Sequence, residues 1–298
     1  MIRLKQINNS IVRVPKVSKE AQKPALGHEL FSEPYCNIFI SAKKKSGKTL
    51  TIFHILKHCL GPNTRLIVFC STLYKDETWA LIRNYFAQKG YDIEGYTSLK
   101  EVVYDEQTGK KESIDRLDLI LKELEAEAEL DALNNDDNDD NSENEKYEMQ
   151  ELWNYVMDAN RSSDVDEDSN TYKASQSKYI APEIIIVLDD LSTELKSSSL
   201  IGLLKKNRHY KMKVIISSQY YLDLKPESRK QIDYFILFKS QTLDKLEAVY
   251  KDADLSIDFK LFLKLYKHAT KDPYSFLYID ARHDRFRKNF THEYILPD

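Results

Sequence analysis

Residues 36–49 read CNIFISAKKKSGKT, and this stretch sets the expected architecture of the chain. The apolar run 36–41 is followed by a polar loop and then by residues 50–59, whose apolar side chains recur at helical spacing. The loop, residues 42–49, matches the phosphate-binding pattern G-x-x-x-x-G-K-[ST] except that Ala42 stands at the first glycine. Because that pattern requires a strand before it and a helix after it, the sequence predicts a nucleotide-binding loop here.

The residues of the loop have separate expected tasks. Gly47 lets the backbone approach the phosphates, and the N–H groups at the start of the helix cradle them. Lys48 reaches the β- and γ-phosphates of ATP, while the hydroxyl of Thr49 completes the shell of a Mg²⁺ ion. The lysines before Ser46 add positive charge and are expected to be solvated. The full nucleotide-binding set is Ala42, Lys43, Lys44, Lys45, Ser46, Gly47, Lys48, Thr49 and Leu50.

A second set of polar residues follows buried strands later in the chain. Residues 184–188 are apolar without alternation, as in a strand buried on both faces, and Asp189 and Asp190 follow directly. Asp189 is expected to hold Mg²⁺ through water, and Asp190 to orient or deprotonate the attacking water. Gln219 follows the strand expected at 213–217 and is expected to contact the γ-phosphate or the water, although its position equally suits a surface glutamine. The acidic pair favours hydrolysis over passive nucleotide binding.

Strands and helices alternate along the rest of the chain. The remaining strands are expected at 65–71, 234–238 and 274–279, and the remaining helices at 76–89, 114–133, 197–206, 243–252 and 257–268. This alternation predicts an α/β fold of three layers, with helices on both faces of a mainly parallel central sheet. Residues 1–34 are expected to form an N-terminal arm, and residues 35–298 a P-loop ATPase domain.

Charge is spread unevenly along the chain. The 44 Lys+Arg and 48 Asp+Glu give a net charge of −4, yet residues 112–170 alone hold 21 acidic and 4 basic residues, so the remainder carries +13. We expect an acidic, disordered insertion at about 112–178, with a solvated loop over 134–146 and a short helix near 149–157. A tolerated surface insertion is the simpler interpretation, and a tail that mimics nucleic acid and shields the basic surface is the alternative.

Composition limits the class of protein. A hydrophobic content of 42% excludes global disorder, and no apolar run is long enough to span a bilayer. The first residues lack the apolar core of a signal peptide. The three cysteines, Cys36, Cys59 and Cys70, are expected to be free thiols in a reducing compartment. These features together predict a soluble intracellular protein.

One segment carries a resemblance to a known family. Residues 207–219 read NRHYKMKVIISSQ and follow an Asp-Asp strand; they resemble the Arg-to-Gln segment of the HerA/FtsK group of DNA-translocating ATPases. Within that group the likeness is strongest to the genome-packaging ATPases of poxviruses and other large DNA viruses. The spacing from Lys48 through Asp189 and Gln219 to the closing run YSFLYID at 274–280 fits the family. The likeness covers most of residues 35–280 but not the acidic stretch.

The resemblance implies both an assembly and a set of partners. It implies a RecA-like core in a homo-oligomeric ring, a pentamer or hexamer, with ATP and Mg²⁺ bound between subunits. Duplex DNA would pass through the ring without sequence preference, and a viral capsid or portal component would be the docking partner. The protein would act in the host cytoplasm or viral factory, or be associated with the virion.

The resemblance also implies an arginine that reaches the γ-phosphate of the neighbouring subunit. Arg208, just before the glutamine strand, is the first choice, and Arg229 is the second; each also suits an ordinary basic surface residue. The acidic pair of the family is often Asp-Glu, whereas Asp190 is one methylene shorter. That difference leaves open whether Asp190 contacts the water directly.

Features expected to bind DNA are diffuse. Two basic clusters suit contacts to the phosphate backbone, and either is equally a solvated face. One comprises Lys205, Lys206, Arg208, Lys211 and Lys213, and the other Arg282, Arg285, Arg287 and Lys288. His54 and His58, one helical turn apart, are expected to pack rather than bind metal, since no further ligands lie at suitable spacing.

The leading hypothesis is an ATP-driven translocase that packages viral double-stranded DNA into a capsid. One alternative is a P-loop kinase acting on a small acceptor, which the Asp-Asp pair and the glutamine strand disfavour. The other is a nucleotide-binding adaptor that assembles on ATP without hydrolysing it.

Overall fold

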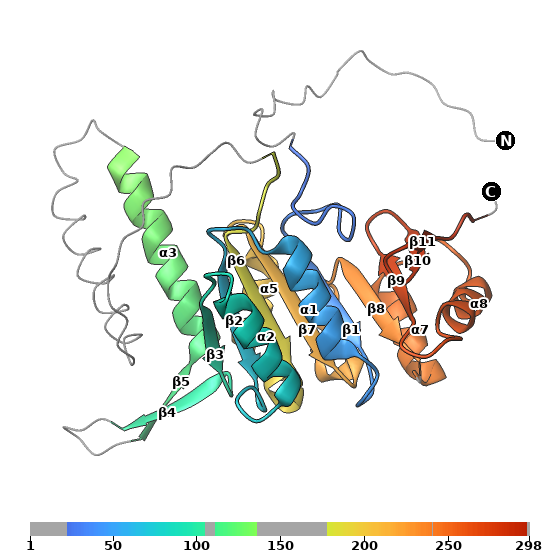
Figure 1. The fold of residues 1–298 in the computed structure, drawn as a ribbon, viewed down its shortest axis with the longest axis horizontal. Coiled ribbons are helices and arrows are strands. Elements are labelled where there is room, and N and C mark those ends of the chain that lie inside the picture. The colour runs from blue at the N-terminus through green and yellow to red at the C-terminus, as the bar shows by residue number, and fades with distance from the viewer. Residues whose placement is uncertain (1–22, 105–110, 136–177, 240, 297–298) are drawn as a thin grey trace, which may run out of the picture.

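A nine-stranded sheet forms the centre of the molecule (Figure 1). The computed structural model describes residues 23–104, 111–135, 178–239 and 241–296. The sheet has the order β11-β10-β9-β8-β1-β7-β6-β2-β3, and the strands from β8 to β3 run parallel. These parallel strands are β8 (Tyr234–Phe238), β1 (Asn37–Ser41), β7 (Met212–Ser218), β6 (Ile184–Asp189), β2 (Arg65–Cys70) and β3 (Ile93–Tyr96).

The other side of the sheet is antiparallel. β9 (Phe276–Asp280) pairs with β8, and β10 (Arg285–Lys288) and β11 (His292–Glu293) follow as successive antiparallel neighbours. The chain therefore enters β9 at the edge of the sheet where β8 ends, as the pairing of Phe238 with Phe276 shows. The mainly parallel α/β fold expected from the sequence is confirmed.

The central strands are apolar because both faces of the sheet are covered. Every residue of β1, β6, β7, β8 and β9 is buried. Alternate side chains enter two separate cores: in β6, Ile186 and Leu188 enter one core, whereas Ile185 and Val187 enter the other. Unbroken apolar runs are what a strand between two helical layers requires.

Helices form the two outer layers. α1 (Lys48–Cys59) and α2 (Glu77–Ala87) cover one face and lie in front of the sheet in Figure 1. α3 (Arg116–Asn135), α5 (Ser198–Lys206), α7 (Leu243–Asp252) and α8 (Phe259–Ala269) pack on the core of the other face, with the short α6 (Pro226–Arg229) beside α5. This arrangement is the three-layer architecture that the alternation of strands and helices predicts.

The first part of the acidic stretch is folded onto the core. α3 buries Leu117, Ile120, Leu121 and Leu124 in the same core as α5, which confirms the helix expected from residue 114 onward. The helix runs from Arg116 to Asn135, so it agrees with the helix expected at 114–133 to within two residues at each end. Most of the loop expected at 134–146, and the helix expected near 149–157, lie outside the described residues.

Several short strands were not expected from the sequence. β3 is a half-buried edge strand of four residues, and β4 (Lys100–Tyr104) and β5 (Lys111–Asp115) form a separate charged hairpin. Such strands give no apolar run, which is the signal that revealed the central strands. The last predicted strand begins two residues later than expected, because Tyr274 lies in a turn with φ 60°.

The described part of the expected N-terminal arm packs against the domain. Leu30 and Phe31 are buried, and the hydroxyl of Tyr278 donates a 2.8 Å hydrogen bond to the carbonyl of Leu30. Ala25 forms an isolated bridge to Ile180. Residues 23–34 thus cover the core rather than extend from it, and residues 1–22 lie outside the described part. Among the described helices, none has the length and hydropathy needed to cross a bilayer.

Candidate nucleotide site

The loop between β1 and α1 has the backbone of an anion-binding site. Gly47 precedes α1 with φ 93°, and Lys45 has φ 62°, both in the left-handed region. The Ser46 hydroxyl donates a 2.6 Å hydrogen bond to the carbonyl of Lys43, which braces the turn. No side chain caps α1 and no acidic residue stands in its first turn. The N–H groups and the positive end of the helix dipole therefore face the loop, where they favour an anion.

Lys48 lies between the two aspartates at the end of β6. Its Nζ is 3.2 Å from Oδ1 of Asp189 and 3.1 Å from Oδ2 of Asp190. The side chains of Lys48 and Asp189 are only 12% and 4% exposed, whereas that of Asp190 is 31% exposed. Burial by itself lowers the pKa of the Lys48 ammonium, but the two carboxylates outweigh it and the pKa lies above its ordinary value. The structure thus brings together the lysine and the acidic pair that the sequence singled out.

Strand order explains how these distant residues meet. β7 lies between β1 and β6, so the loop after β1 and the aspartates after β6 are two strands apart at one edge of the sheet. Asp190 has φ 57°, and its N–H donates a 3.0 Å hydrogen bond to the carbonyl of Ser217 in β7. A left-handed backbone outside glycine is uncommon and is retained where surrounding structure enforces it. The turn therefore holds the Asp190 side chain toward Lys48.

Trp79 belongs to the site, although the sequence gave no reason to expect it. Its indole Nε1 donates a 3.0 Å buried hydrogen bond to Oδ2 of Asp189, and the side chain is 1% exposed. A buried indole N–H needs an acceptor, and a buried carboxylate needs donors. Only the fold places α2 against the end of β6, so a tryptophan on the apolar side of a predicted helix carries no signal of this role.

Gln219 lies directly after β7, between the loop and the acidic pair. Its side chain is half-buried, and the neighbouring loop is braced by a 2.6 Å hydrogen bond from the Ser218 hydroxyl to Asp223. A second glutamine that the sequence did not suggest, Gln241, exchanges hydrogen bonds with Ser41 at the end of β1. The position of Gln219 at the end of β7 therefore agrees with the sequence, whereas its contact to a phosphate or a water stays a prediction.

The remaining loop residues differ in exposure. Ala42 is fully buried, and its N–H donates to the carbonyl of Ser218, which ties the loop to β7. Leu50 is 61% exposed at the first turn of α1. Thr49 is half-buried and, with Asp189, offers hard oxygen donors of the kind that Mg²⁺ prefers. Among the described residues, no group of three or more His, Cys, Asp or Glu forms a metal site.

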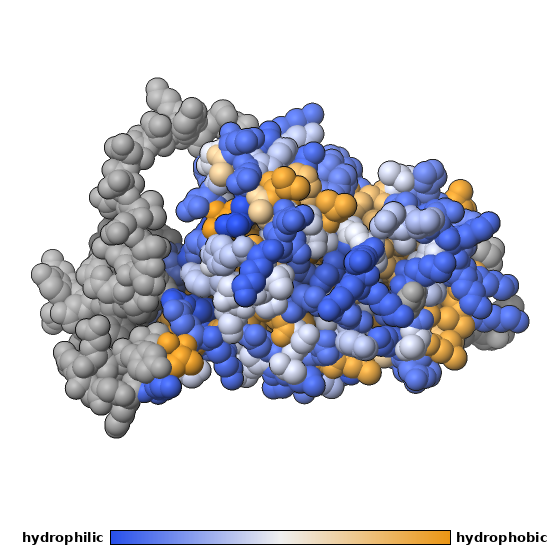
Figure 2. Space-filling model, turned by 60° about the horizontal axis from the view of Figure 1, so that its bottom comes forward, coloured by the Kyte–Doolittle hydropathy of each residue, from blue (hydrophilic) through white to orange (hydrophobic). Residues whose placement is uncertain are grey.

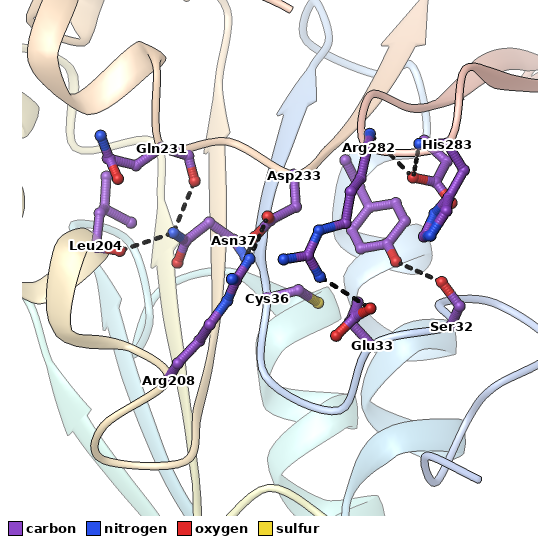
Figure 3. Close-up of polar contacts among 12 residues, drawn as sticks. Ser32, Glu33, Cys36, Asn37, Leu204, Arg208, Gln231, Asp233, Arg282 and His283 are labelled. Carbon is purple, nitrogen blue, oxygen red and sulfur yellow. Dashed lines mark hydrogen bonds and ion pairs between the residues drawn. The ribbon is translucent and has the colours of Figure 1, made fainter. Parts of the chain in front are cut away.

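Arg208 lies where the parallel strands begin, at the opposite end of the strands from the loop. It precedes β7, and its Nη2 is 3.1 Å from Oδ1 of Asp233, beside Arg282, which pairs with Glu33 at 2.9 Å (Figure 3). The Arg208 side chain is 51% exposed. Burial raises the pKa of the Asp233 carboxyl despite a hydrogen bond from the Asn37 N–H and the two arginines. An accessible pair of arginines therefore marks the edge where the parallel strands begin.

Arg229 is held inside the domain. Its Nε is 3.2 Å from Oδ2 of Asp252, both side chains are less than one-fifth exposed, and the guanidinium lies over the ring of Tyr221. To reach another subunit, Arg229 would have to leave these partners. The two candidate arginines therefore differ in accessibility, since the side chain of Arg208 is exposed and that of Arg229 is not.

The first basic cluster expected from the sequence is not continuous. Lys213 is fully buried in β7, where its ammonium contacts Sγ of Cys36 at 3.2 Å and the carbonyl of Glu33 at 3.1 Å, so its inclusion in a surface cluster was wrong. Burial raises the pKa of the Cys36 thiol to about 12, although the nearby ammonium acts in the opposite direction. Lys206 and Lys211 are paired with carboxylates of Glu125 and Glu183.

Each member of the second basic cluster also lies close to a carboxylate. Arg282, Arg285, Arg287 and Lys288 each pair with an acidic side chain: Glu33, Glu293, Glu293 and Asp272, respectively. Cations that are already paired with carboxylates offer less to a phosphate backbone than free ones do. Elsewhere, the His54 ring stacks on Phe290 and His58 pairs with Glu29, in line with the packing expected for this pair. All three cysteines are free and buried.

Comparisons with known proteins agree with the resemblance noted in the sequence. A family model described as Poxvirus A32 protein matches residues 145–279, a range that contains the acidic pair, Arg208 and Gln219 but not the loop at 42–49. The chain is 32% identical over 111 residues to protein 088R of Invertebrate iridescent virus 3, covering 36% of this chain and 42% of that protein. It is 30% identical over 103 residues to protein 075L of Invertebrate iridescent virus 6, covering 33% and 40%. The matched region thus spans about two-fifths of these relatives.

Solved structures with a similar arrangement were also found. The genome packaging NTPase B204 of Sulfolobus turreted icosahedral virus 2, in complex with AMP, aligns with a TM-score of 0.44 and 18% identity, covering 89% of this chain and all of that chain. The cytoplasmic domain of the Type VII secretion ATPase EccC of Thermomonospora curvata aligns with a TM-score of 0.36 and 12% identity, covering 81% of this chain and 24% of that one. These likenesses are distant, and the site described above rests on its own geometry.

Proposed function

We propose that this chain is an ATP-hydrolysing motor subunit that moves viral double-stranded DNA into a capsid. The observation that carries the proposal is the cluster of Lys48, Asp189 and Asp190 beside the anion-binding loop. A lysine that can neutralise phosphates and two carboxylates at one sheet edge are the parts that phosphoryl transfer to water requires. The match to the poxvirus family supports the viral setting.

ATP binding would rearrange the cluster. The Lys48 ammonium would exchange its contacts with the two carboxylates for the β- and γ-phosphate oxygens, which lie closer to the loop. Asp189, still oriented by the Trp79 N–H, would then be free to hold Mg²⁺ through water, and the Thr49 hydroxyl would be the second protein group that holds it. Bound Mg²⁺ supplies neutralisation of the charge that develops on the phosphates. Asp190, the more exposed carboxylate, would orient the attacking water, and Gln219 would contact that water or the γ-phosphate.

The position of Arg208, at the end of the sheet opposite the loop, supports a site shared between subunits. β7 has seven residues, which at ~3.3 Å each separate Arg208 from its own loop by about 20 Å. That distance prevents Arg208 from reaching the γ-phosphate of its own subunit. In a head-to-tail ring, in contrast, the edge bearing Arg208 would face the loop of the next copy. Arg229 is the weaker candidate because it is enclosed by Asp252 and Tyr221.

A row of lysines on α8 supports a polyanionic partner such as DNA. Lys260, Lys264, Lys267 and Lys271 follow one another at intervals of three or four residues along α8 and just beyond it, and all four are exposed. α8 contains no acidic residue, and within the described part of the chain no ion pair joins these four lysines to a carboxylate. The nearby Asp272 is engaged by Lys288. A row of free cations suits the regularly spaced phosphates of a duplex and reads no base sequence.

Two other functions remain as outcomes of the test. A P-loop kinase would transfer the γ-phosphate to a small acceptor, and a nucleotide-dependent adaptor would bind ATP without turnover. Neither uses the second carboxylate as a water-orienting group. A need for a small acceptor therefore distinguishes the kinase from a hydrolase, and tolerance of Asp190→Asn distinguishes the adaptor.

The test is steady-state phosphate release from ATP and Mg²⁺, with and without duplex DNA, for the wild type, Lys48→Ala and Asp190→Asn. We expect turnover that DNA stimulates and that both variants lose by about 100-fold or more. Turnover that requires a small acceptor would indicate a kinase. The adaptor would be indicated if the wild type showed no turnover with DNA, even when assembled, and if Asp190→Asn still bound ATP.

A further inference from the structure

An exposed aromatic ring lies beside the phosphate-binding loop. An ideal Cβ placed on Gly47 would lie 3.5 Å from Cδ1 of Tyr274, so the ring lies next to the Gly47 backbone with room for little more than a methyl group between them. Tyr274 is nevertheless 72% exposed, the highest value among the exposed aromatic side chains of the described residues. An exposed ring against a loop built for phosphates has nothing in the described chain to stack on it.

The turn that carries Tyr274 is fixed in place. Tyr274 has φ 60°, a strained conformation for an aromatic residue. Three hydrogen bonds hold the surrounding turn: the Ser275 hydroxyl to the carbonyl of Asp272 at 2.6 Å, the Thr270 hydroxyl to the carbonyl of Tyr266 at 2.8 Å, and the Phe276 N–H to Oδ1 of Asn289 at 3.0 Å. The ring is therefore presented by a braced turn, so little ordering entropy remains to be lost when a ligand stacks on it.

Strand order accounts for the position of the ring. Because β9 runs antiparallel to β8, the turn before β9 lies at the edge where β8 and β1 end, which is the edge of the loop. Figure 2 brings this edge forward and shows a mainly hydrophilic surface with small, separate apolar patches. The acidic pair lies on the β7 and β6 side of the loop, whereas Tyr274 lies on the β8 and β9 side. A nucleotide whose γ-phosphate points toward Asp190 would extend its nucleoside away from the acidic pair.

We infer that Tyr274 is the stacking platform for the base of the bound nucleotide. This inference rests on the proposed ATP site and adds a subsite for the nucleobase to the phosphate subsite. A base has an apolar face that stacks on an aromatic ring whatever its exocyclic groups, so the platform contributes affinity without reading adenine in particular. Tyr220, exposed on the loop after β7 with the Lys245 ammonium 3.9 Å from its ring centroid, is the rival platform at the same edge.

The experiment compares ATP with inorganic triphosphate, which carries the phosphates and no base. Binding of each ligand is measured by calorimetry for the wild type, Tyr274→Asn, Tyr274→Phe and Tyr220→Asn. Asn removes the ring and tolerates a left-handed backbone, so Tyr274→Asn keeps the turn without strain. We expect Tyr274→Asn to lower the affinity for ATP about ten-fold or more. Its affinity for triphosphate should stay within about two-fold of the wild-type value. Tyr274→Phe, which keeps the ring, and Tyr220→Asn should bind both ligands as the wild type does.

Other outcomes overturn the inference. Equal weakening of ATP and triphosphate would mean that Tyr274 only supports the loop. Loss of ATP affinity in Tyr220→Asn instead would place the base on the rival ring. Lys48→Ala distinguishes failure of this inference from failure of the proposed function, because it should lower the affinity for both ligands. A wild-type protein that binds neither ligand would contradict the ATP site itself.

Discussion

Lys48 shows how one side chain couples the two halves of the site. Its ammonium bridges two carboxylates that would otherwise repel each other in a largely buried position, and the Trp79 N–H satisfies one of the remaining oxygens. Each of these contacts crosses between elements that are far apart in the sequence. The residue-level predictions therefore concern the strength and the pH range of this coupling.

Replacement of Trp79 by Phe should uncouple Asp189 from α2. The variant keeps an aromatic ring but leaves a buried carboxylate oxygen without its donor, which costs about 1–3 kcal/mol in addition to the loss of packing. A double-mutant cycle with Asp189→Ala, which removes the acceptor altogether, is measured by urea unfolding and isolates the interaction. Additive effects of the two substitutions would show that the hydrogen bond contributes nothing measurable.

The stabilisation that Lys48 provides should not change through the neutral and mildly alkaline range. The folded state raises the pKa of Lys48 above its ordinary value of 10.5, so this stability is complete below that pH and is lost as the pH rises through the raised value. The difference in the free energy of unfolding between the wild type and Lys48→Met should therefore stay constant from pH 7 to about 10. A difference that shrinks steadily between pH 7 and about 9 would contradict the ion-paired geometry.

At the scale of elements, the amphipathic helices α3 and α8 have different functions in the domain. α3 belongs to an acidic stretch yet buries four leucine and isoleucine side chains, so it anchors that stretch to the domain. α8 buries Phe262, Leu265, Tyr266 and Ala269 and turns its lysines outward. The same periodicity thus gives an anchor in one place and a charged surface in the other.

Replacement of Leu121 by Ala tests whether α3 is part of the core. Leu121 is 7% exposed, and truncation of a buried leucine costs about 2–5 kcal/mol. Chemical unfolding should show a loss in that range, while the exposed neighbour Lys122→Ala stays within about 0.5 kcal/mol. An equally small effect of Leu121→Ala would mean that the helix is a detachable part of the insertion.

Replacement of the α8 lysines tests the proposed DNA-binding surface. Lys260, Lys264, Lys267 and Lys271 are changed together to Gln; the matched control changes Lys75, Lys89, Lys196 and Lys230, which are also exposed but scattered. The α8 variant should lose at least about ten-fold in affinity for duplex DNA and show a smaller dependence on salt. ATP binding, measured separately, should be unchanged in both variants. Equal losses in the two variants would mean that net charge alone attracts DNA.

At the scale of the whole molecule, the sequence predicted the elements that carry periodic or continuous apolar patterns. The central strands, the loop at 42–49 and the acidic pair after β6 could be identified because each has a local signature. Trp79, Gln241 and Tyr274 could not, since their positions beside the site depend on segments that only strand order brings together. The buried Lys213 was misjudged for the same reason: local charge does not reveal that Cys36 and Glu33 surround the ammonium.

The whole molecule also carries two unlike edges. The loop, the acidic pair and Tyr274 lie where the parallel strands end, and Arg208 and Arg282 lie where they begin. Our central claim is that these edges, from neighbouring copies, form one hydrolytic site. Assembly would then be required for turnover rather than added to it.

The most direct test mixes two inactive variants. Lys48→Ala lacks the phosphate contact but keeps Arg208, and Arg208→Ala lacks the arginine but keeps the loop; each alone should lose about 10³-fold in ATP turnover. In an equimolar mixture, about a quarter of the interfaces would combine an intact loop with an intact arginine, so about a quarter of wild-type turnover should return. No recovery in mixed assemblies of wild-type size, or full turnover by Arg208→Ala alone, would contradict the claim.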